Sequence, residues 1–394
     1  MSRRNNSIQN MGANRMQRSG PRRMQWLDIA KGFGIIIVMI IHSIMPVVNA
    51  ISTHLSSFVI PLFFFMAGIT YNNEKHRGRL TRFAKTRGKR FLIPYFIIYI
   101  FVLLVLVPAS IFVELPITAN ELFFWFIYGA GPPYMALHIW FLPVLFFGLL
   151  LFAVGDRIAN GNEFALFGIF VLLMPLAAYF LWIMFQPVLI PWHLSSIMLA
   201  SIFVYVGNTF RYKRGLTPLT KDNTILDILA VVILSAITLL VSQLNGYVDM
   251  AMDNYGVSPF LYLITGITGS ILILVLSHLM TKSSHASRFM LAYGSQSQEI
   301  YESHPAGFPL TAGLFILLGF SIADLANLHL VLWPARFIAA MLVGYYFVKY
   351  GVNRSRVLSF IFRGVAKTEA GRKTSKLPGS EKPTELPYSK HSES

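Results

Sequence analysis

The sequence contains no cysteine among its 394 residues. This absence excludes disulfide scaffolds, thiolate metal sites, iron–sulfur clusters and cysteine nucleophiles, and it leaves the redox compartment undetermined. Charged residues are also scarce, at 13% of the chain, whereas soluble domains contain about 25%. Hydrophobic residues make up 55%, so the composition is typical of a protein that lies largely within a membrane.

Ten apolar stretches are each long enough to cross a bilayer, which takes about 20 residues. They cover residues 26–47, 54–73, 91–112, 138–155, 164–185, 192–209, 224–243, 259–280, 300–320 and 329–350. The sequence therefore predicts an all-α polytopic integral membrane protein, a bundle of about ten transmembrane helices. We find no internal repeat, so the inverted-repeat design of many secondary transporters has no support here.

Lysine and arginine occur in every second connection between these stretches. The other connections, which are residues 48–53, 113–137, 186–191, 244–258 and 321–328, contain neither. Because basic loops stay on the cytoplasmic side, this pattern predicts that both termini are cytoplasmic. We expect the protein to lie in the plasma (inner) membrane. The net charge of +16 then reflects topology, and we predict no nucleic acid partner.

Polar segments flank the apolar region. We expect a disordered basic tail over residues 1–24, the membrane domain over 25–350, and a basic, largely disordered cytoplasmic tail over 351–394. The N-terminus resembles a cleaved signal peptide, but its apolar stretch exceeds the signal core of about 7–15 residues. That stretch also contains Lys31 and His42, so we predict that it is retained.

The first apolar stretch carries three ionisable residues, Asp28, Lys31 and His42. Such residues are costly at membrane depth, so each is a candidate functional residue. Lys31 and His42 lie eleven residues apart, about 20° beyond three full helical turns and roughly 16 Å along the axis, hence on one face. Asp28 is placed to pair with Lys31. In the alternative interpretation, His42 is a hydrogen-bonded core histidine and Lys31 extends to the membrane interface.

Further polar residues lie near the predicted helix ends. His138, two residues before Trp140, has a depth similar to that of His42, so the two histidines could share an outward-facing cavity. The run from Glu299 to His304 is too polar to face lipid and must face protein or water. Arg336 is the only lysine or arginine in the outer half, and we expect it to pair with a carboxylate or to bind an anionic ligand. We interpret the remaining membrane histidines as structural, namely His54, His193 and His278.

Residues 74–90 contain eight lysines and arginines. This connection is either a topology anchor or a phosphate site. Arg87 and Arg90 lie three residues apart, on one face where the third predicted helix begins. Because a guanidinium fork suits bidentate contacts with phosphate, we favour the phosphate site.

Five motifs occur in the order found in the membrane-bound acyltransferase-3 family, and the chain resembles most closely its fucose 4-O-acetylase-like branch. The motifs are LDIAKGFGIIIVMIIH, FFFMAGITY, RGKRFLIP, HIWFLP and IYESHP. The resemblance covers about residues 24–350. It implies an O-acyltransferase that moves an acetyl group from cytoplasmic acetyl-CoA to a hydroxyl of an extracytoplasmic glycan or other cell-envelope acceptor.

The resemblance also implies roles for individual residues. Arg87 and Arg90 match the family's Arg-x-x-Arg element and would bind the coenzyme A phosphates. Lys31 and His42 match its pairing of a basic residue with a histidine, although many relatives carry arginine where Lys31 stands. The acyl arm would pass Lys31, and His42 would act as general base, to which its ordinary pKa is suited, with His138 as a second catalytic candidate. Candidates for binding the acceptor are Glu121, Trp140, Arg336, Asp28 and His304, and Asp249 and Asp253 are further carboxylates that could orient it.

Two other functions fit parts of the pattern. A proton-coupled transporter or exporter of a small polar solute or sugar would explain the Lys31 and His42 column, but it gives no reason for the arginine pair. A non-catalytic membrane scaffold is the third possibility.

The histidines lack zinc-ligand spacing, so no metal is predicted. Many relatives carry an extra extracytoplasmic domain, and we expect any second transfer step to need another protein, such as polysaccharide-synthesis machinery. The acceptor, the acyl length and the oligomeric state are left open.

Overall fold

The computed structural model describes residues 24–109, 118–130, 137–214 and 224–365. These residues form helices joined by short connections, and the only β pairing among them is an isolated bridge between Asp249 and Asn254. The fold is all-helical, as the sequence predicts. The predicted disordered tails fall mostly on residues 1–23 and 366–394, which lie outside the described residues.

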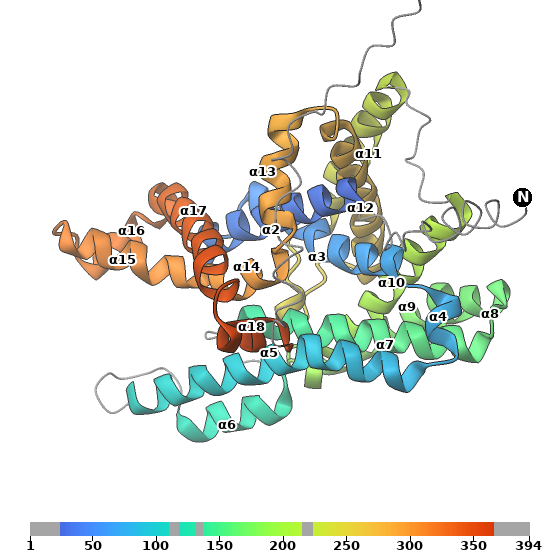
Figure 1. Ribbon diagram of the computed structural model, residues 1–394, viewed down its shortest axis with the longest axis horizontal. Coiled ribbons are helices and arrows are strands. Elements are labelled where there is room, and N and C mark those ends of the chain that lie inside the picture. The colour runs from blue at the N-terminus through green and yellow to red at the C-terminus, as the bar shows by residue number, and fades with distance from the viewer. Residues whose placement is uncertain (1–23, 110–117, 131–136, 215–223, 366–394) are drawn as a thin grey trace, which may run out of the picture.

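The α-helices follow one another along the chain, and Figure 1 shows their arrangement. They are α2 (Gln25–Ile44), α3 (Ala50–Thr70), α4 (Asn73–Arg77), α5 (Leu80–Ala109), α6 (Ala119–Tyr128), α7 (Phe141–Ala159), α8 (Glu163–Phe167), α9 (Met174–Phe185), α10 (Leu194–Arg214), α11 (Thr224–Asn245), α12 (Pro259–Met280), α13 (Ser284–Gly294), α14 (Ser297–Ser303), α15 (Gly307–Leu317), α16 (Ile322–Asn327), α17 (His329–Tyr346) and α18 (Arg356–Arg363). Short 3₁₀ or π segments are η2 (Leu137–Trp140), η3 (Gly168–Leu173), η4 (Pro191–His193), η5 (Met250–Met252), η6 (His304–Ala306) and η7 (Phe347–Val352).

Eight helical segments among the described residues are long and apolar enough to cross a membrane, which makes the chain a polytopic membrane protein. Each overlaps one of the ten predicted spans. The predicted span 91–112 belongs to α5, a 30-residue helix that already begins at Leu80. The predicted span 300–320 is divided among α14, η6 and α15, because Pro305 has no N–H to continue the helical hydrogen bonds.

Helix α2 lies in the middle of the bundle and packs against α3, α12, α13 and α17 (Figure 1). Helix α3 in turn packs against α10 and α12. Glycines allow the close approach, since a Cβ atom on Gly68 would collide with the carbonyl of Val204, and one on Gly207 with that of Phe65. Small residues at helix contacts are typical of membrane bundles.

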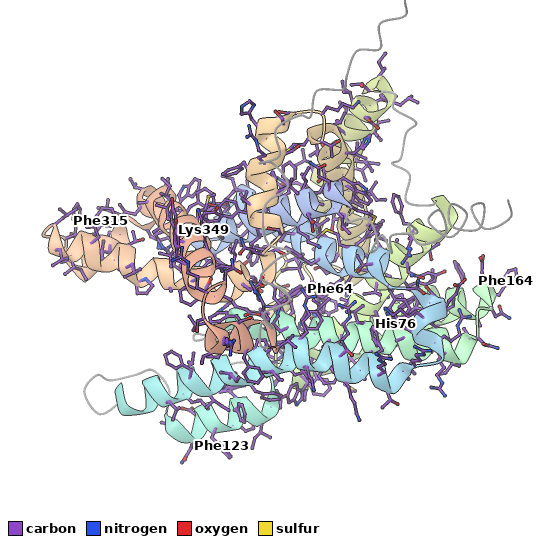
Figure 2. All side chains as sticks on the ribbon, viewed as in Figure 1. Phe64, His76, Phe123, Phe164, Phe315 and Lys349 are labelled. Carbon is purple, nitrogen blue, oxygen red and sulfur yellow. The ribbon has the colours of Figure 1, made fainter. Side chains whose placement is uncertain are left out.

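The periphery of the bundle is apolar. Phe123 and Phe164 are 61% and 90% exposed, and Figure 2 places both at the edge of the molecule. Phe64, by contrast, is fully buried near the centre. Apolar side chains on the outside are what a lipid environment favours, because lipid tails are as apolar as the residues themselves.

A buried carboxylate fixes the basic connection between α3 and α5. Asp156 of α7 has no exposed surface, and its Oδ1 accepts hydrogen bonds from Arg77 at 2.8 Å and Asn73 at 3.0 Å. Asn208 of α10 donates to Asn73 at 2.9 Å. Because a buried charge must be paired, Arg77 serves the fold, whereas α5 carries Arg82, Lys85, Arg87, Lys89 and Arg90.

The segment from residue 351, predicted as the start of a tail, continues as helix. Residues up to Val352 extend α17 as η7, and α18 packs against α5. Arg363 forms an ion pair with Glu299, and Asn353 donates to Gln296 at 2.5 Å. These contacts join the C-terminal helix to α14 and its preceding turn.

Candidate functional site

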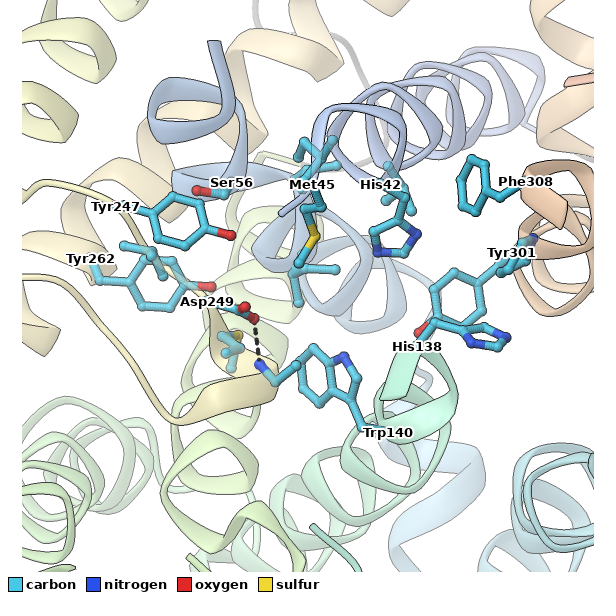
Figure 3. Close-up of a pocket in the computed structure, with 18 residues that line it drawn as sticks. His42, Met45, Ser56, His138, Trp140, Tyr247, Asp249, Tyr262, Tyr301 and Phe308 are labelled. Carbon is cyan, nitrogen blue, oxygen red and sulfur yellow. Dashed lines mark hydrogen bonds between the residues drawn. The ribbon is translucent and has the colours of Figure 1, made fainter. Parts of the chain in front are cut away.

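A cavity of about 330 Å³ lies between α2, α3, η2, the connection 246–258 and the turn from α14 to α15. Figure 3 shows His42, Tyr301 and Phe308 on one side and Tyr247, Tyr262 and Asp249 on the other. Its wall thus combines aromatic rings with a few polar groups, which is typical of small-molecule sites.

His42 enters the cavity from the last turn of α2. Its side chain is partly exposed, and its Nδ1 lies 2.8 Å from Nε2 of His304. His304, in η6, has no exposed surface and does not line the cavity. The structure therefore places His304 directly behind His42, and a role in binding the acceptor stays a prediction for this residue.

His138 and Trp140 line the same cavity from η2. The Nε2 of His138 lies 3.4 Å from the backbone oxygen of Glu302, and its ring centroid is 6.2 Å from that of His304. The cavity thus brings together two of the three predicted catalytic residues, which come from helices almost 100 residues apart.

Lys31 lies away from the cavity, on the face of α2 that also carries His42. Its Nζ is 3.1 Å from Oδ1 of Asp28, so the predicted pairing is confirmed, and its side chain is 32% exposed. The cavity extends along α2 to Val38, one helical turn before His42, and Lys31 is not among its lining residues.

Arg87 and Arg90 lie on α5 within the helix and not at its start, because the helix begins at Leu80, about three turns before the predicted span 91–112. Arg87 is half-buried over the ring of Phe83 and has no carboxylate partner among the described residues. Burial, and then the charge of Arg90, lowers the pKa of Arg87. Burial and the charges of Arg87 and Lys75 likewise lower the pKa of His76. Two neighbouring guanidinium groups, neither of which forms an ion pair with another described residue, make a site that attracts an anion.

Helix α14 connects the arginines to the histidines. Gln298 accepts from Nε of Arg90 at 3.0 Å and donates to the buried Glu302 at 3.0 Å. His304 follows Gln298 by six residues, roughly 9 Å along a helix axis. The basic patch, which is the pair Arg87 and Arg90, and the cavity therefore lie at the two ends of one short helix.

Asp249 reaches the cavity from the connection 246–258. Its Oδ1 accepts the N–H of Ala251 at 3.0 Å, and burial raises its pKa. Burial and then the charge of Asp249 raise the pKa of Tyr247 as well. A carboxyl group with a raised pKa and a phenol, side by side, can both hydrogen-bond a polar ligand.

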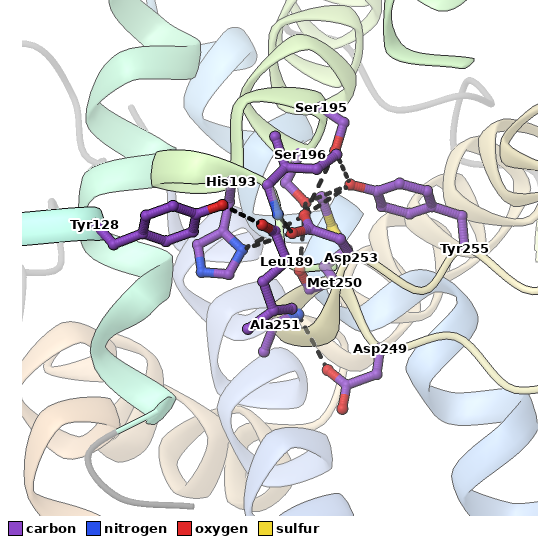
Figure 4. Close-up of polar contacts among 11 residues, drawn as sticks. Tyr128, Leu189, His193, Ser195, Ser196, Asp249, Met250, Ala251, Asp253 and Tyr255 are labelled. Carbon is purple, nitrogen blue, oxygen red and sulfur yellow. Dashed lines mark hydrogen bonds and ion pairs between the residues drawn. The ribbon is translucent and has the colours of Figure 1, made fainter. Parts of the chain in front are cut away.

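Asp253, the other predicted carboxylate of this connection, does not line the cavity. Figure 4 shows that it lies in a buried cluster that joins the connection to the start of α10. It accepts from the N–H of Ile190 at 2.9 Å and from the hydroxyl of Tyr255 at 3.2 Å. Longer contacts of 3.4 Å reach His193, Ser195 and Ser196. This cluster holds the connection in place and so positions Asp249.

Glu121 and Arg336, two further predicted residues, also lie outside the cavity lining. Glu121 is exposed and caps α6, where its Oε2 accepts from both the N–H and the hydroxyl of Thr118 at 2.8 Å. These hydrogen bonds lower the pKa of Glu121. A role of Glu121 in binding the acceptor stays a prediction.

Arg336 does not have the predicted carboxylate partner among the described residues. Its Nη1 lies 2.7 and 2.8 Å from the ring nitrogens of His329 and 3.3 Å from the carbonyl of Met45. His329 in turn lies 2.9 Å from the carbonyl of Ile44. The last carbonyls of a helix have no partner within it, so these two side chains cap α2 just after His42.

Several residues of the site were not predicted from the sequence. Tyr262 and Ser56 line the cavity, and Gln298 joins Arg90 to Glu302. The polar run 295–304 signalled that this segment faces protein or water, but no sequence signal identified the partner of each residue. No group of three His, Asp or Glu side chains in the described part of the chain has a metal-ligating arrangement.

Comparison with known proteins gives one match. Residues 24–349 match the family described as Acyltransferase domain, of the acyltransferase-3 type. The match covers the same region as the motifs quoted above, and it confirms the predicted family. No curated protein and no solved structure matches the chain.

Proposed function

Because the chain belongs to the acyltransferase-3 family, it is a membrane acyltransferase, and we propose that it transfers an acetyl group from acetyl-CoA to a hydroxyl of an extracytoplasmic glycan or other cell-envelope acceptor. The observation that carries this proposal is the position of His42. It lines a cavity at one end of α14, while Gln298, at the other end of that helix, accepts a hydrogen bond from Arg90. We also propose the plasma (inner) membrane as its location.

The donor docks at Arg87 and Arg90. The phosphates of coenzyme A supply the anionic charge that this patch lacks, and an arginine fork suits them. The patch is on the side where basic connections predominate, which is the cytoplasmic side in the proposed topology. Lys31, at the same end of α2 as the start of α14, then lies beside the path of the acyl arm.

The acceptor enters from the opposite end. Trp140, Tyr247 and Tyr262 offer aromatic faces to the carbon skeleton of a sugar, and Asp249 and Ser56 offer hydrogen bonds to its hydroxyls. A cavity of about 330 Å³ is at the small end of ligand pockets. It therefore suits a single sugar ring of a longer or membrane-attached glycan, brought there by polysaccharide-synthesis machinery.

His42 acts as general base. As the acceptor oxygen attacks the thioester carbonyl, Nε2 of His42 takes the hydroxyl proton, a C–O bond forms and the C–S bond breaks. The protonated imidazole then returns this proton to the departing sulfur, so that coenzyme A leaves as a thiol. General acid–base catalysis of this kind contributes about 10²–10⁴-fold to rate.

The test uses purified full-length protein in detergent micelles with acetyl-CoA labelled in the acetyl group. Because the chain contains no cysteine, a thiol-reactive dye reports only the coenzyme A released. The label is followed into oligosaccharides from the envelope of the source cell. We expect transfer by the wild-type protein and a loss of about 100-fold or more in His42→Ala.

A matched control is His285→Ala, because His285 is exposed on α13 and does not line the cavity. This variant should keep the wild-type rate. Full transfer activity in His42→Ala would remove the proposed mechanism, and an absence of transfer from acetyl-CoA to any envelope glycan would remove the proposed reaction.

A further inference from the structure

The rings of His42 and His304 meet edge to edge. Their nearest nitrogens are 2.8 Å apart, the ring centroids are 5.0 Å apart, and the ring planes differ by only 11°. The centroid distance exceeds the N···N distance by about 2.2 Å, which the two ring radii account for only if the contact lies in line with both rings. This is the geometry of a straight N–H···N hydrogen bond.

The other nitrogen of His304 determines which ring donates. Nδ1 of His304 lies 2.8 Å from the backbone oxygen of Tyr301 and 3.3 Å from that of Ile300. A carbonyl oxygen only accepts, so Nδ1 of His304 carries a hydrogen. The carbonyl of Tyr301 is available for this bond because Pro305, four residues on, has no N–H to offer it.

His304 is neutral in this environment. Its side chain has no exposed surface, and the rings packed around it belong to His42, His138, Tyr301 and Phe308, none of them a carboxylate. An unpaired cation buried among such groups would cost several kcal/mol. A neutral imidazole carries one hydrogen, so Nε2 of His304 has a free lone pair and must accept from Nδ1 of His42.

The hydrogen on Nδ1 of His42 leaves its Nε2 as the unprotonated nitrogen. This atom has no hydrogen bond among the described residues, and it is not among their fully buried unpaired polar atoms. His42 lines the cavity and His304 does not. The basic nitrogen of His42 is therefore the one open to the cavity.

We propose that His304 is a positioning residue that holds His42 as the Nδ1–H tautomer, with the Nε2 lone pair directed at the acceptor hydroxyl. This inference rests on the proposed role of His42 as general base. When Nε2 takes the acceptor proton, the bond from Nδ1 to His304 becomes charge-assisted and stronger. His304 itself gains and loses no proton during the reaction, and the backbone of Tyr301 keeps it oriented.

The experiment compares His304→Leu with His304→Gln. The glutamine amide oxygen can take the place of Nε2 as acceptor, whereas leucine fills similar space and accepts nothing. We expect His304→Leu to lower kcat about 100-fold with little change in the KM for acetyl-CoA. His304→Gln should recover most of this loss, which a role in packing alone would not produce.

A second measurement does not depend on activity. Nitrogen-15 NMR of histidine-labelled protein in micelles distinguishes protonated from unprotonated ring nitrogens, and the His42→Ala spectrum identifies the signals of His42. We expect Nδ1 of His42 to be protonated and Nε2 unprotonated in the wild-type protein, and we expect this preference to be lost in His304→Leu.

The outcomes separate the two proposals. If His42→Ala is inactive while His304→Leu keeps the wild-type kcat, the role of His304 is wrong and the proposed function stands. If His42→Ala keeps full activity, the general-base role is wrong, and the spectrum still tests the tautomer. Protonated Nε2 on His42 in the wild-type spectrum overturns the inference even if His304→Leu does not fold.

Discussion

Gly294 at the end of α13 packs directly against the backbone of Asp28 in α2, so closely that an added methyl group would collide with the Asp28 carbonyl oxygen. Gly32 makes a similar contact with the carbonyl of Met290. The two glycines fix α2 against α13 at the end that carries Lys31. Because α2 also carries His42, this contact contributes to the position of the cavity wall.

We predict that Gly294→Ala destabilises the protein. Overpacking a tight contact costs about 1–3 kcal/mol, which outweighs the gain of about 0.5–1 kcal/mol that alanine gives in a helix. Thermal unfolding in detergent, followed by intrinsic fluorescence, measures the change. Gly313→Ala in α15 is the control, since an added Cβ there meets no atom within 4 Å and should leave the unfolding temperature unchanged or raise it. Equal unfolding temperatures for the two variants would contradict the prediction.

We predict that Arg87→Lys and Arg90→Lys each raise the KM for acetyl-CoA about tenfold with little change in kcat. Lysine keeps the charge but loses the guanidinium fork that suits phosphate, and an effect on KM alone indicates lost binding of the donor. Steady-state release of coenzyme A measures both constants. Arg82→Lys, on an exposed turn of the same helix, should behave as wild type. A similar rise in KM for that variant would indicate a general effect of charge or folding.

We predict that the affinity for 3′-dephospho-coenzyme A rises as the pH falls from 7.5 to 6.0. Burial and nearby cations lower the pKa of His76 in the free protein, and a bound pyrophosphate offsets those cations and raises this pKa again. The complex then holds more protons than the free protein, so binding is favoured at lower pH.

The measurement is the dissociation constant at pH 7.5 and at pH 6.0, where we expect a decrease of roughly threefold. The pyrophosphate does not titrate in this range, so the change reports on the protein. In His76→Gln the dissociation constant should not depend on pH. If it still falls by the same factor, another group is responsible.

We predict that Asp249→Asn weakens the binding of the acceptor glycan and leaves the binding of acetyl-CoA unchanged. Losing a hydrogen bond to a substrate hydroxyl costs about 1 kcal/mol, which corresponds to a several-fold rise in the KM for the glycan. Release of coenzyme A is measured with and without the oligosaccharide. The stimulation by the oligosaccharide should decrease while the KM for acetyl-CoA stays unchanged. An unchanged response to the glycan would place the acceptor elsewhere.

We predict that Asp253→Asn, in contrast, lowers the unfolding temperature. An amide at this position presents an N–H group to donors such as Ile190 and Tyr255, and an unsatisfied buried group costs about 1–3 kcal/mol. Asp249→Asn is the matched control in the same connection and should unfold close to wild type. If Asp253→Asn is as stable as this control, the buried cluster does not hold the connection in place.

Much of the architecture could be predicted from the sequence because apolar stretches of about 20 residues must form helices in a bilayer. The composition and motif order predicted the all-helical membrane fold and the family. The sequence did not predict where α5 begins, because the charged residues from Leu80 onward form helix outside the apolar stretch. Pro305 predicts a kink in the span 300–320, and the structure divides this span into α14, η6 and α15.

The site was only partly predictable. His42 and His138 have the residue type and depth of cavity residues, and the spacing of Asp28 and Lys31 determined their pairing. The sequence alone thus determined which side chains are costly to bury and which lie on one helical face. Only the tertiary structure decided that His304 lies behind His42, that Arg90 meets Gln298, and that Asp249 faces the cavity while Asp253 does not. These contacts join helices up to 262 positions apart, and helical periodicity relates residues only within one helix.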